Sequence, residues 1–279
     1  LEFRRVLFRS YGLIVWIKQS MIDSGIATLF KIHQPVPVPI IIVGNIRVGG
    51  TGKTPLVIAL ANELVQLGFK PGVISRGYQP NGGGKLSAPT AVGFDSDPIS
   101  VGDESVLMAR RIHHGIPIWV YPKRKACIDA LLQSHPEVNV IISDDGLQHA
   151  GLVRWSAREG GRDLELVVQD ERGIGNGRLL PAGPLRESAN RERDATITIT
   201  DQPTSNQILS NPKQFQLKPA IHNAYPLNRP HEAISFTQML TRLVGLKIGA
   251  LAAIGNPEKF FKALTKLGVH LEQSLGLAD

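Results

Sequence analysis

A glycine-rich segment with a lysine and two threonines is the strongest chemical signal in the sequence. Backbone N–H groups of such glycines can close around a polyphosphate, while the Lys53 ammonium reaches its terminal oxygens and the Thr54 hydroxyl binds Mg²⁺ at a helix N-terminus. The strict pattern G-x4-G-K-[S/T] requires glycine at position 47, where this chain has Arg47. The segment predicts a phosphate-binding loop with ATP and Mg²⁺ as cofactors, and a glycine-rich turn before a helix is the alternative. Its residues are Gly49, Gly50, Thr51, Gly52, Lys53 and Thr54.

Two adjacent aspartates, Asp144 and Asp145, form a second candidate group. They follow the apolar run 140–142 and precede Gly146. In phosphate-loop enzymes an aspartate at a strand's carboxyl end holds Mg²⁺ directly or through water, and open α/β sheets bind ligands at that end. We therefore expect Asp144 to be the first metal ligand. An Asp-Asp-Gly sequence can also simply open a turn.

An acidic pair and a basic pair lie between these two elements. A kinase needs a carboxylate that accepts the proton of the acceptor hydroxyl, and cations that stabilise the phosphoryl charge. Asp103 and Arg124 suit these roles. Each pair also has an ordinary explanation: Asp103-Glu104 can start a helix and stabilise its dipole, and Lys123-Arg124 can be solvated surface.

The elements around these residues follow the order of a phosphate-binding fold. The β-branched run 36–43 predicts a buried strand, and Pro55 and Gly68 suit the first turn and the C-cap of a helix. Helix-like segments near 103–114 and 123–134 alternate with further apolar runs. This alternation predicts an α/β fold with a parallel sheet covered by helices. The apolar runs are 73–75, 117–121, 138–142 and 164–168.

Composition narrows the class of protein. The length of 279 residues exceeds the roughly 150 typical of one domain, so we expect one large domain or two unequal ones. With 42% hydrophobic and 20% charged residues, neither a disordered chain nor a coiled coil is indicated. A single cysteine, Cys127, fits the reducing cytosol. The net charge of +7 favours anionic partners such as nucleotides, phospholipid surfaces or nucleic acid.

The N-terminal region needs a separate interpretation. Residues 1–10 lack an initial methionine and a signal-peptide layout, and we interpret them as a non-native leader. Apolar residues recur at roughly helical spacing in 11–35, which predicts an amphipathic helix. That helix could lie in a membrane interface or pack on the protein's own core. No uncharged apolar run reaches the roughly 18 residues of a membrane-spanning helix.

Seven motifs occur in an order that resembles the tetraacyldisaccharide 4'-kinase family, the lipid A kinases of Gram-negative bacteria. The resemblance covers about residues 36–268, and DDGLQH and LLPAGPLRE are more specific than the phosphate loop. The motifs are GNIRVGGTGKTP, ISRGY, GDE, PKR, ISDDGLQH, GNGRLLPAGPLRE and IGNPEKFF.

This resemblance implies a fold, a reaction and a location. The fold is a P-loop NTPase-like core at 36–200, followed by a β linker and a smaller second α/β domain at 201–279, with 11–35 as the membrane-associating helix. The reaction moves the ATP γ-phosphate to the 4'-hydroxyl of an acylated glucosamine disaccharide 1-phosphate in lipid A biosynthesis. The location is the cytoplasmic face of the bacterial inner membrane. No nucleic acid and no obligate protein partner are expected.

The resemblance also implies roles for individual residues. Lys53 and Thr54 keep the nucleotide and Mg²⁺ roles given above. The other implied roles are a base (Asp103), metal-side carboxylates (Glu104, Asp144, Asp145), phosphoryl-stabilising cations (Arg124, Arg186), supporting site residues (Gln148, His149) and contacts to the lipid substrate (Arg76, Tyr78).

The chain departs from the family pattern in two further places. A later Phe-Pro-Asp-His-His-type segment, whose histidine assists the catalytic aspartate, does not occur before Asp279. We therefore expect an incomplete C-terminal domain, and a chain that binds ATP but phosphorylates lipid poorly. The polar stretch 155–162 has the character of an insertion in a loop.

Two other functions remain as alternatives. A regulatory or partitioning ATPase has a similar loop but requires a signature lysine where this chain has Val48. A basic nucleic-acid-binding protein would need an aromatic-interleaved basic cluster, a helix-turn-helix signature or zinc-ligand spacing, none of which we find in the sequence.

Overall fold

The computed structural model divides the chain into two units, Leu1–Leu217 and Lys218–Asp279. The predicted leader 1–10, the predicted helix 11–35 and Tyr78 lie outside the described residues. The structure describes residues 36–77, 86–112, 115–149, 160–200, 213–218, 223–226, 232–254 and 256–277, together with residues 152, 155, 157 and 220.

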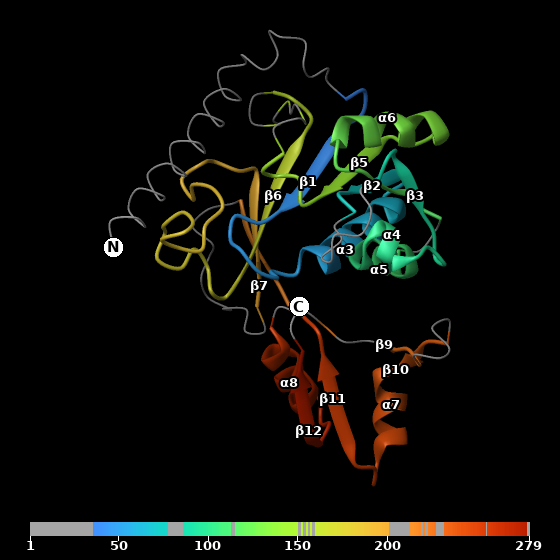
Figure 1. Ribbon diagram of the computed structural model, residues 1–279, viewed down its shortest axis with the longest axis vertical. Coiled ribbons are helices and arrows are strands. Elements are labelled where there is room, and N and C mark those ends of the chain that lie inside the picture. The colour runs from blue at the N-terminus through green and yellow to red at the C-terminus, as the bar shows by residue number, and fades with distance from the viewer. Residues whose placement is uncertain are drawn as a thin grey trace. The chain divides into compact units, whose positions relative to one another are not determined.

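The first unit is built on an eight-stranded sheet with the order β3-β4-β2-β5-β1-β6-β7-β8 (Figure 1). All neighbouring strands are parallel except β3 and β4, which are antiparallel. This confirms the predicted α/β class. The strands are β1 (Ile40–Gly44), β2 (Pro71–Ser75), β3 (Thr90–Val92), β4 (Ile118–Val120), β5 (Val140–Asp144), β6 (Leu164–Asp170), β7 (Ala195–Ile199) and β8 (Gln214–Leu217).

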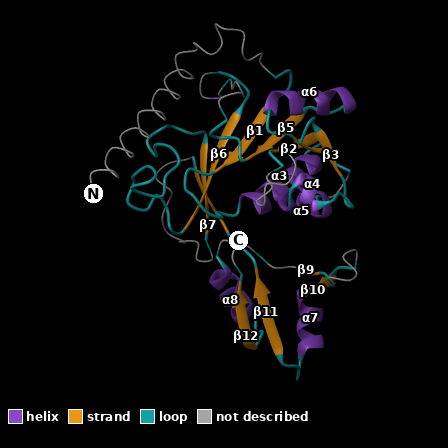
Figure 2. Cartoon of the chain, in the orientation of Figure 1, coloured by secondary structure: helices purple, strands orange, loops and turns teal. Residues whose placement is uncertain are grey.

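Helices cover both faces of the central strands, which explains why β1, β2 and β5 are buried along their whole length (Figure 2). On one face Ile41 and Val43 pack with α3 (Lys53–Gln66) and α5 (Asp103–Arg111), and α4 (Pro98–Val101) precedes α5. On the other face Ile40 and Ile42 pack with α6 (Arg124–Ser134). The period of two along β1 thus supplies two separate hydrophobic cores.

The second unit contains a short hairpin and a β-α-β arrangement. Strand β9 (Asn223–Ala224) pairs antiparallel with β10 (Ile234–Ser235), and α7 (Phe236–Leu243) follows with a capping box at Ser235. Strand β11 (Ile248–Ala252) pairs parallel with β12 (Leu271–Gly276), and α8 (Pro257–Lys266) connects them. The sequence placed the boundary between domains at 200, but β8 pairs with β7 in the core sheet, so the first unit continues to Leu217.

Among the described residues, no helix has the length and apolar character needed to cross a membrane.

Cys127 provides a probe of the core beneath α6. Its side chain is fully buried, and burial raises the pKa of its thiol to about 12, against the opposing charge of Arg124. Since the thiolate is the reactive form, we expect no modification by iodoacetamide at pH 8 in the native protein and rapid modification in urea. Mass spectrometry of the tryptic peptide measures both. Equally fast modification without urea would contradict this packing.

Candidate active site

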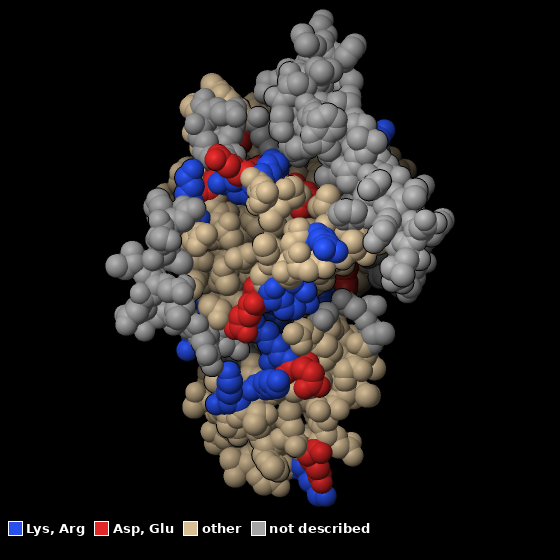
Figure 3. Space-filling view, turned by 90° about the vertical axis from the view of Figure 1, so that its left-hand side faces the viewer, with Lys and Arg blue, Asp and Glu red and all other residues tan. Residues whose placement is uncertain are grey.

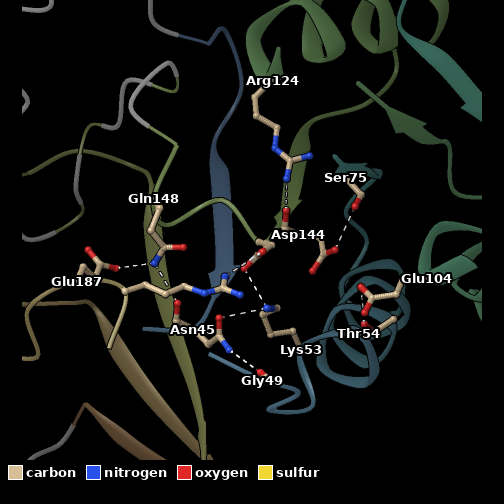
Figure 4. A network of polar contacts seen from close by, with 12 residues as sticks. Asn45, Gly49, Lys53, Thr54, Ser75, Glu104, Arg124, Asp144, Gln148 and Glu187 are labelled. Carbon is tan, nitrogen blue, oxygen red and sulfur yellow. Dashed lines mark hydrogen bonds and ion pairs between the residues drawn. The ribbon is translucent and has the colours of Figure 1, made fainter. Parts of the chain in front are cut away.

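The parallel strand pairing brings the two predicted motifs to one edge of the sheet. Val43 of β1 lies beside Asp144 of β5, and Ile74 of β2 lies beside Ser143. The glycine-rich loop leaves β1 at this edge, and Asp144 ends β5 there. Figure 4 shows the resulting cluster of polar side chains around Lys53 and Asp144.

The glycine-rich loop has the backbone conformations that only glycine adopts readily. Gly49 and Gly52 have φ of 103° and 83°. A Cβ on Gly52 would also lie 2.5 Å from Cδ1 of Ile199, so both strain and space require glycine before the first turn of α3. The loop therefore leads directly into a 14-residue helix whose positive N-terminal end suits a phosphate.

Arg47, the departure from the strict loop pattern, occupies a different place. It forms a β-bridge with Leu185, and its Nη1 donates to the carbonyl oxygens of Arg172 and Gly173 at 3.1 and 3.2 Å. The positive φ values of the loop fall on Gly49 and Gly52. A glycine at 47 is thus not needed for the turn that precedes Lys53.

Lys53 lies between an amide and a carboxylate. Its Nζ is 3.2 Å from Oδ1 of Asn45 and 3.0 Å from Oδ1 of Asp145. The other oxygen of Asp145 is 3.4 Å from Nη1 of Arg186. Burial alone would raise the pKa of Asp145, but the positive charges of Lys53 and Arg186 bring it below its usual value. Asp145 is therefore held as an anion between two cations.

Asp144 has the opposite environment. Its side chain is 2% exposed, its Oδ2 accepts a hydrogen bond from Ser75 Oγ at 3.1 Å, and its Oδ1 has no hydrogen-bond partner among the residues described. Burial, assisted by the charge of Asp145, raises the pKa of Asp144. Arg124 is 1% exposed and donates from Nη2 to the Asp144 carbonyl oxygen at 2.6 Å, which fixes the end of β5.

The acidic pair at the start of α5 faces the same edge of the sheet. The Thr54 hydroxyl donates to Oε2 of Glu104 at 3.3 Å. Although Glu104 is exposed, desolvation of its carboxyl group, followed by the negative charge of Asp144, raises its pKa. Asp103 is exposed, its Oδ1 accepts a hydrogen bond from the Glu104 backbone N–H at 2.8 Å, and its charge also raises the pKa of Glu104.

These contacts fit a magnesium ion held together with phosphate oxygens. A buried carboxylate oxygen of Asp144 that lacks a partner, with a raised pKa, is suited to a divalent cation. Thr54 and Glu104 provide further oxygen ligands beside it. Nowhere in the described ranges do three His, Cys, Asp or Glu side chains converge into a metal cluster. Mg²⁺ commonly takes only one or two carboxylates and completes its shell with phosphates and water.

The remaining predicted site residues lie around this cluster. Gln148 Nε2 donates to the Asn45 carbonyl at 3.0 Å and to Oε1 of Glu187 at 2.9 Å, so the loop after β5 is tied to the phosphate loop. His149 Nε2 lies 3.0 Å from the Pro122 carbonyl. Arg76 is exposed just after β2.

Three residues in this network escaped the sequence interpretation: Asn45, Ser75 and Glu187. Asn45 and Ser75 are polar residues at the carboxyl ends of β1 and β2, where the fold collects functional groups, so their positions were a usable signal. Glu187 ends the motif GNGRLLPAGPLRE, but its contact with Gln148 joins residues 39 positions apart and has no signature in the sequence.

The two aspartates should respond oppositely to removal of their charge. Because the pKa of Asp144 is raised in the folded state, its protonated form contributes stability below the ordinary value of 3.8, and this contribution is lost as pH rises through the folded pKa. At pH 7 we expect Asp144→Asn to leave the thermal midpoint equal or higher. A fall of several degrees would contradict the conclusion that the Asp144 carboxylate is buried with too little compensating positive charge.

Asp145→Asn should destabilise the protein at pH 7. The lowered pKa of Asp145 gives stability above the ordinary value of 3.8 that is lost as pH falls through the folded pKa. Since the side chain is 37% exposed, we expect a loss of up to about 1 kcal/mol. Urea unfolding at pH 7 and pH 3 measures it: the difference from the parent protein should shrink at pH 3. An undiminished difference there would contradict the ion pairs with Lys53 and Arg186.

Comparison with known proteins agrees with this arrangement. The model of the tetraacyldisaccharide-1-P 4'-kinase family matches residues 5–279. A tetraacyldisaccharide 4'-kinase of Polynucleobacter necessarius is 53% identical over 266 residues, which cover 93% of this chain and 72% of that protein. The enzyme of the same name from Bordetella parapertussis is 40% identical over 270 residues, covering 96% and 73%.

A solved structure has a similar fold. The crystal structure of the "apo" form of LpxK from Aquifex aeolicus in complex with ATP is 26% identical, with a TM-score of 0.74, and the match covers 100% of this chain and 82% of that one. These comparisons favour the kinase over the partitioning ATPase and the nucleic-acid-binding protein. The chain belongs to the tetraacyldisaccharide-1-P 4'-kinase family and is an ATP-dependent kinase.

Proposed function

We propose that the cluster around Lys53 and Asp144 transfers the ATP γ-phosphate to the 4'-hydroxyl of tetraacyldisaccharide 1-phosphate in lipid A biosynthesis. The observation that carries this assignment is the Lys53 ammonium at the N-terminus of α3, 3.0 Å from Asp145 and beside the buried Asp144. Phosphoryl transfer depends mainly on such preorganised charge.

On this proposal the residues of the cluster divide the work between nucleotide and metal. Backbone N–H groups of Gly49–Gly52 and the Lys53 ammonium bind the phosphates. Asp144, Thr54 and Glu104 hold Mg²⁺, which would supply charge stabilisation to the β- and γ-phosphate oxygens. The raised pKa of Asp144 suits this role, because its buried carboxylate is no longer an uncompensated charge when a cation arrives. Glu104, which is exposed beside it, adds a second carboxylate.

The acceptor side of the site is assigned to the start of α5 and the loops beside it. Asp103 is exposed next to Glu104 and is available to accept the hydroxyl proton. Arg186 approaches the transferred phosphoryl group from beside Asp145. The sequence suggested Arg124 as a cation that stabilises the phosphoryl group. Because Arg124 is buried and donates to the Asp144 carbonyl oxygen, we propose instead that it holds Asp144 in place. Arg76 and Tyr78 are assigned to the lipid substrate.

The distribution of charge on the surface is relevant to whether the protein binds nucleic acid. On the face drawn in Figure 3, Lys and Arg side chains are interspersed with Asp and Glu. Among the described residues on that face, the basic side chains have acidic neighbours, whereas a groove that tracks a nucleic acid backbone is mainly basic.

Removing the Lys53 charge should impair phosphoryl transfer. We expect Lys53→Ala to lower turnover by about 10²–10³-fold, as does loss of one preorganised donor in other enzymes. The assay is transfer from radiolabelled ATP to the acylated disaccharide, with Lys70→Ala as the matched control, because Lys70 is exposed and lies before β2 at the opposite edge of the sheet. Near-normal transfer by Lys53→Ala would remove Lys53 from the mechanism, and ATP turnover without any lipid acceptor would favour an ATPase.

We also propose that residues 11–35 place the protein on the cytoplasmic face of the inner membrane. Flotation with vesicles should show binding to anionic lipid at low salt, with incomplete release by salt and full release by detergent. Deletion of residues 1–30 should abolish flotation and increase soluble recovery, and zwitterionic vesicles are the control. A full-length chain that stays unbound at low salt would contradict this location.

A further inference from the structure

We propose that Asn45 is a positioning residue that sets the place of the Lys53 ammonium and the shape of the phosphate loop. The inference rests on the proposed function in one respect, the binding of ATP phosphates by Lys53. It goes further by naming a residue outside the glycine-rich segment on which that lysine depends.

The contacts of Asn45 join the beginning and the end of the loop. Its side chain is fully buried; Nδ2 donates to the Gly49 carbonyl oxygen at 3.1 Å, and Oδ1 accepts from Lys53 Nζ at 3.2 Å. Figure 4 shows the amide between Gly49 and Lys53. A single side chain therefore fixes the turn at Gly49 relative to the cation that follows the loop.

An amide suits this position better than a carboxylate or an aliphatic side chain. It supplies one donor and one acceptor at the same time, which a carboxylate or an aliphatic side chain cannot do. It also adds no charge. The Lys53 ammonium already faces the anion Asp145, and a second carboxylate beside it would compete with phosphate for the same positive charge.

A buried ionic cluster is linked to the backbone of Asn45 through Gln148. The Asn45 carbonyl accepts a hydrogen bond from Gln148, whose amide also donates to Glu187. Glu187 is 6% exposed, with Oε2 2.9 Å from Arg193 Nη2 and 3.3 Å from Arg191 Nε. Arg191 Nη2 in turn lies 3.1 Å from Oε1 of Glu165 on β6, the strand next to β1. Since buried pairs of this kind resist displacement, the backbone at Asn45 has a fixed reference point.

A double-mutant cycle on ATP affinity tests the dependence of Lys53 on Asn45. Four proteins are compared by equilibrium binding of Mg·ATP: the parent, Asn45→Ser, Lys53→Met and the double variant. We expect about 10-fold weaker binding from Asn45→Ser alone, and at most about 2-fold further weakening when it is added to Lys53→Met, because coupled residues are non-additive. Losses that multiply would overturn the inference.

The same cycle separates this inference from the proposed function. If Lys53→Met binds ATP as tightly as the parent, the assigned role of Lys53 fails, and the positioning role fails with it. If Lys53→Met weakens binding but the losses multiply, only the role of Asn45 fails.

A second measurement uses the protein without nucleotide and needs no activity. The rate of Lys53 acylation by an amine-selective reagent is followed by mass spectrometry. We expect Lys53 to be acylated several-fold faster in Asn45→Ser, because its ammonium loses the hydrogen-bond acceptor at position 45. In the isosteric Asn45→Asp, which keeps an acceptor oxygen at that position, acylation should be no faster than in the parent. The control is Asn139→Ser: Asn139 Oδ1 accepts from the Lys70 backbone N–H at 2.8 Å, far along the sheet from Lys53, and the rate should stay at the parent value. Equal acceleration by both Asn45 variants would point to general loosening and overturn the inference.

Discussion

The parallel pairing of β1 with β5 places Val43 beside Asp144, and the rest of the site depends on this register. A shift by one residue would move the side chain of Asp144 from the face of the sheet that packs with α3 to the face that packs with α6. The register is fixed because alternate residues of both strands are buried against helices on opposite faces. The site is therefore as stable as the core beneath it, and its geometry is a consequence of packing.

Two neighbouring aspartates at this edge of the sheet have pKa values that are shifted in opposite directions. Asp145 has φ of 49° and turns towards Lys53 and Arg186, whose charges lower its pKa. Asp144 ends the strand and points into the buried interior of the site, where desolvation raises its pKa. One carboxylate is thus neutralised by the protein, whereas the other keeps an oxygen without a partner. Asp145 therefore fixes the position of Lys53, and Asp144 remains available to bind a metal cation.

Much of the first unit could be predicted because its signals are local. The β-branched run before Gly44, the glycine-rich loop and the aspartates after β5 each combine an element with its chemistry within a few residues. β3 has three residues, and β8 has exposed residues at three of its four positions, so neither carries a clear periodic pattern. The domain boundary was consequently placed before β8, although the strand belongs to the core sheet.

The candidate site was predictable in its residue types but not in their partners. Asp144 and Lys53 were expected to face the ligand, yet the contacts that orient them come from Ser75, Asn45 and Asp145. The sequence pattern also could not reveal that Arg124 is buried, because Lys123-Arg124 is typical of solvated surface. Pairings between residues far apart in the chain have no local signature.

We propose that the buried Asp144 is the protein's main ligand for the magnesium ion that accompanies ATP. The most direct test is the dependence of ATP affinity on Mg²⁺ concentration in the parent protein and in Asp144→Asn, since a neutral amide is a poorer ligand for this hard cation. We expect Mg²⁺ to tighten ATP binding in the parent and to have little effect in the variant. Superimposable Mg²⁺ titration curves for the two proteins would contradict it.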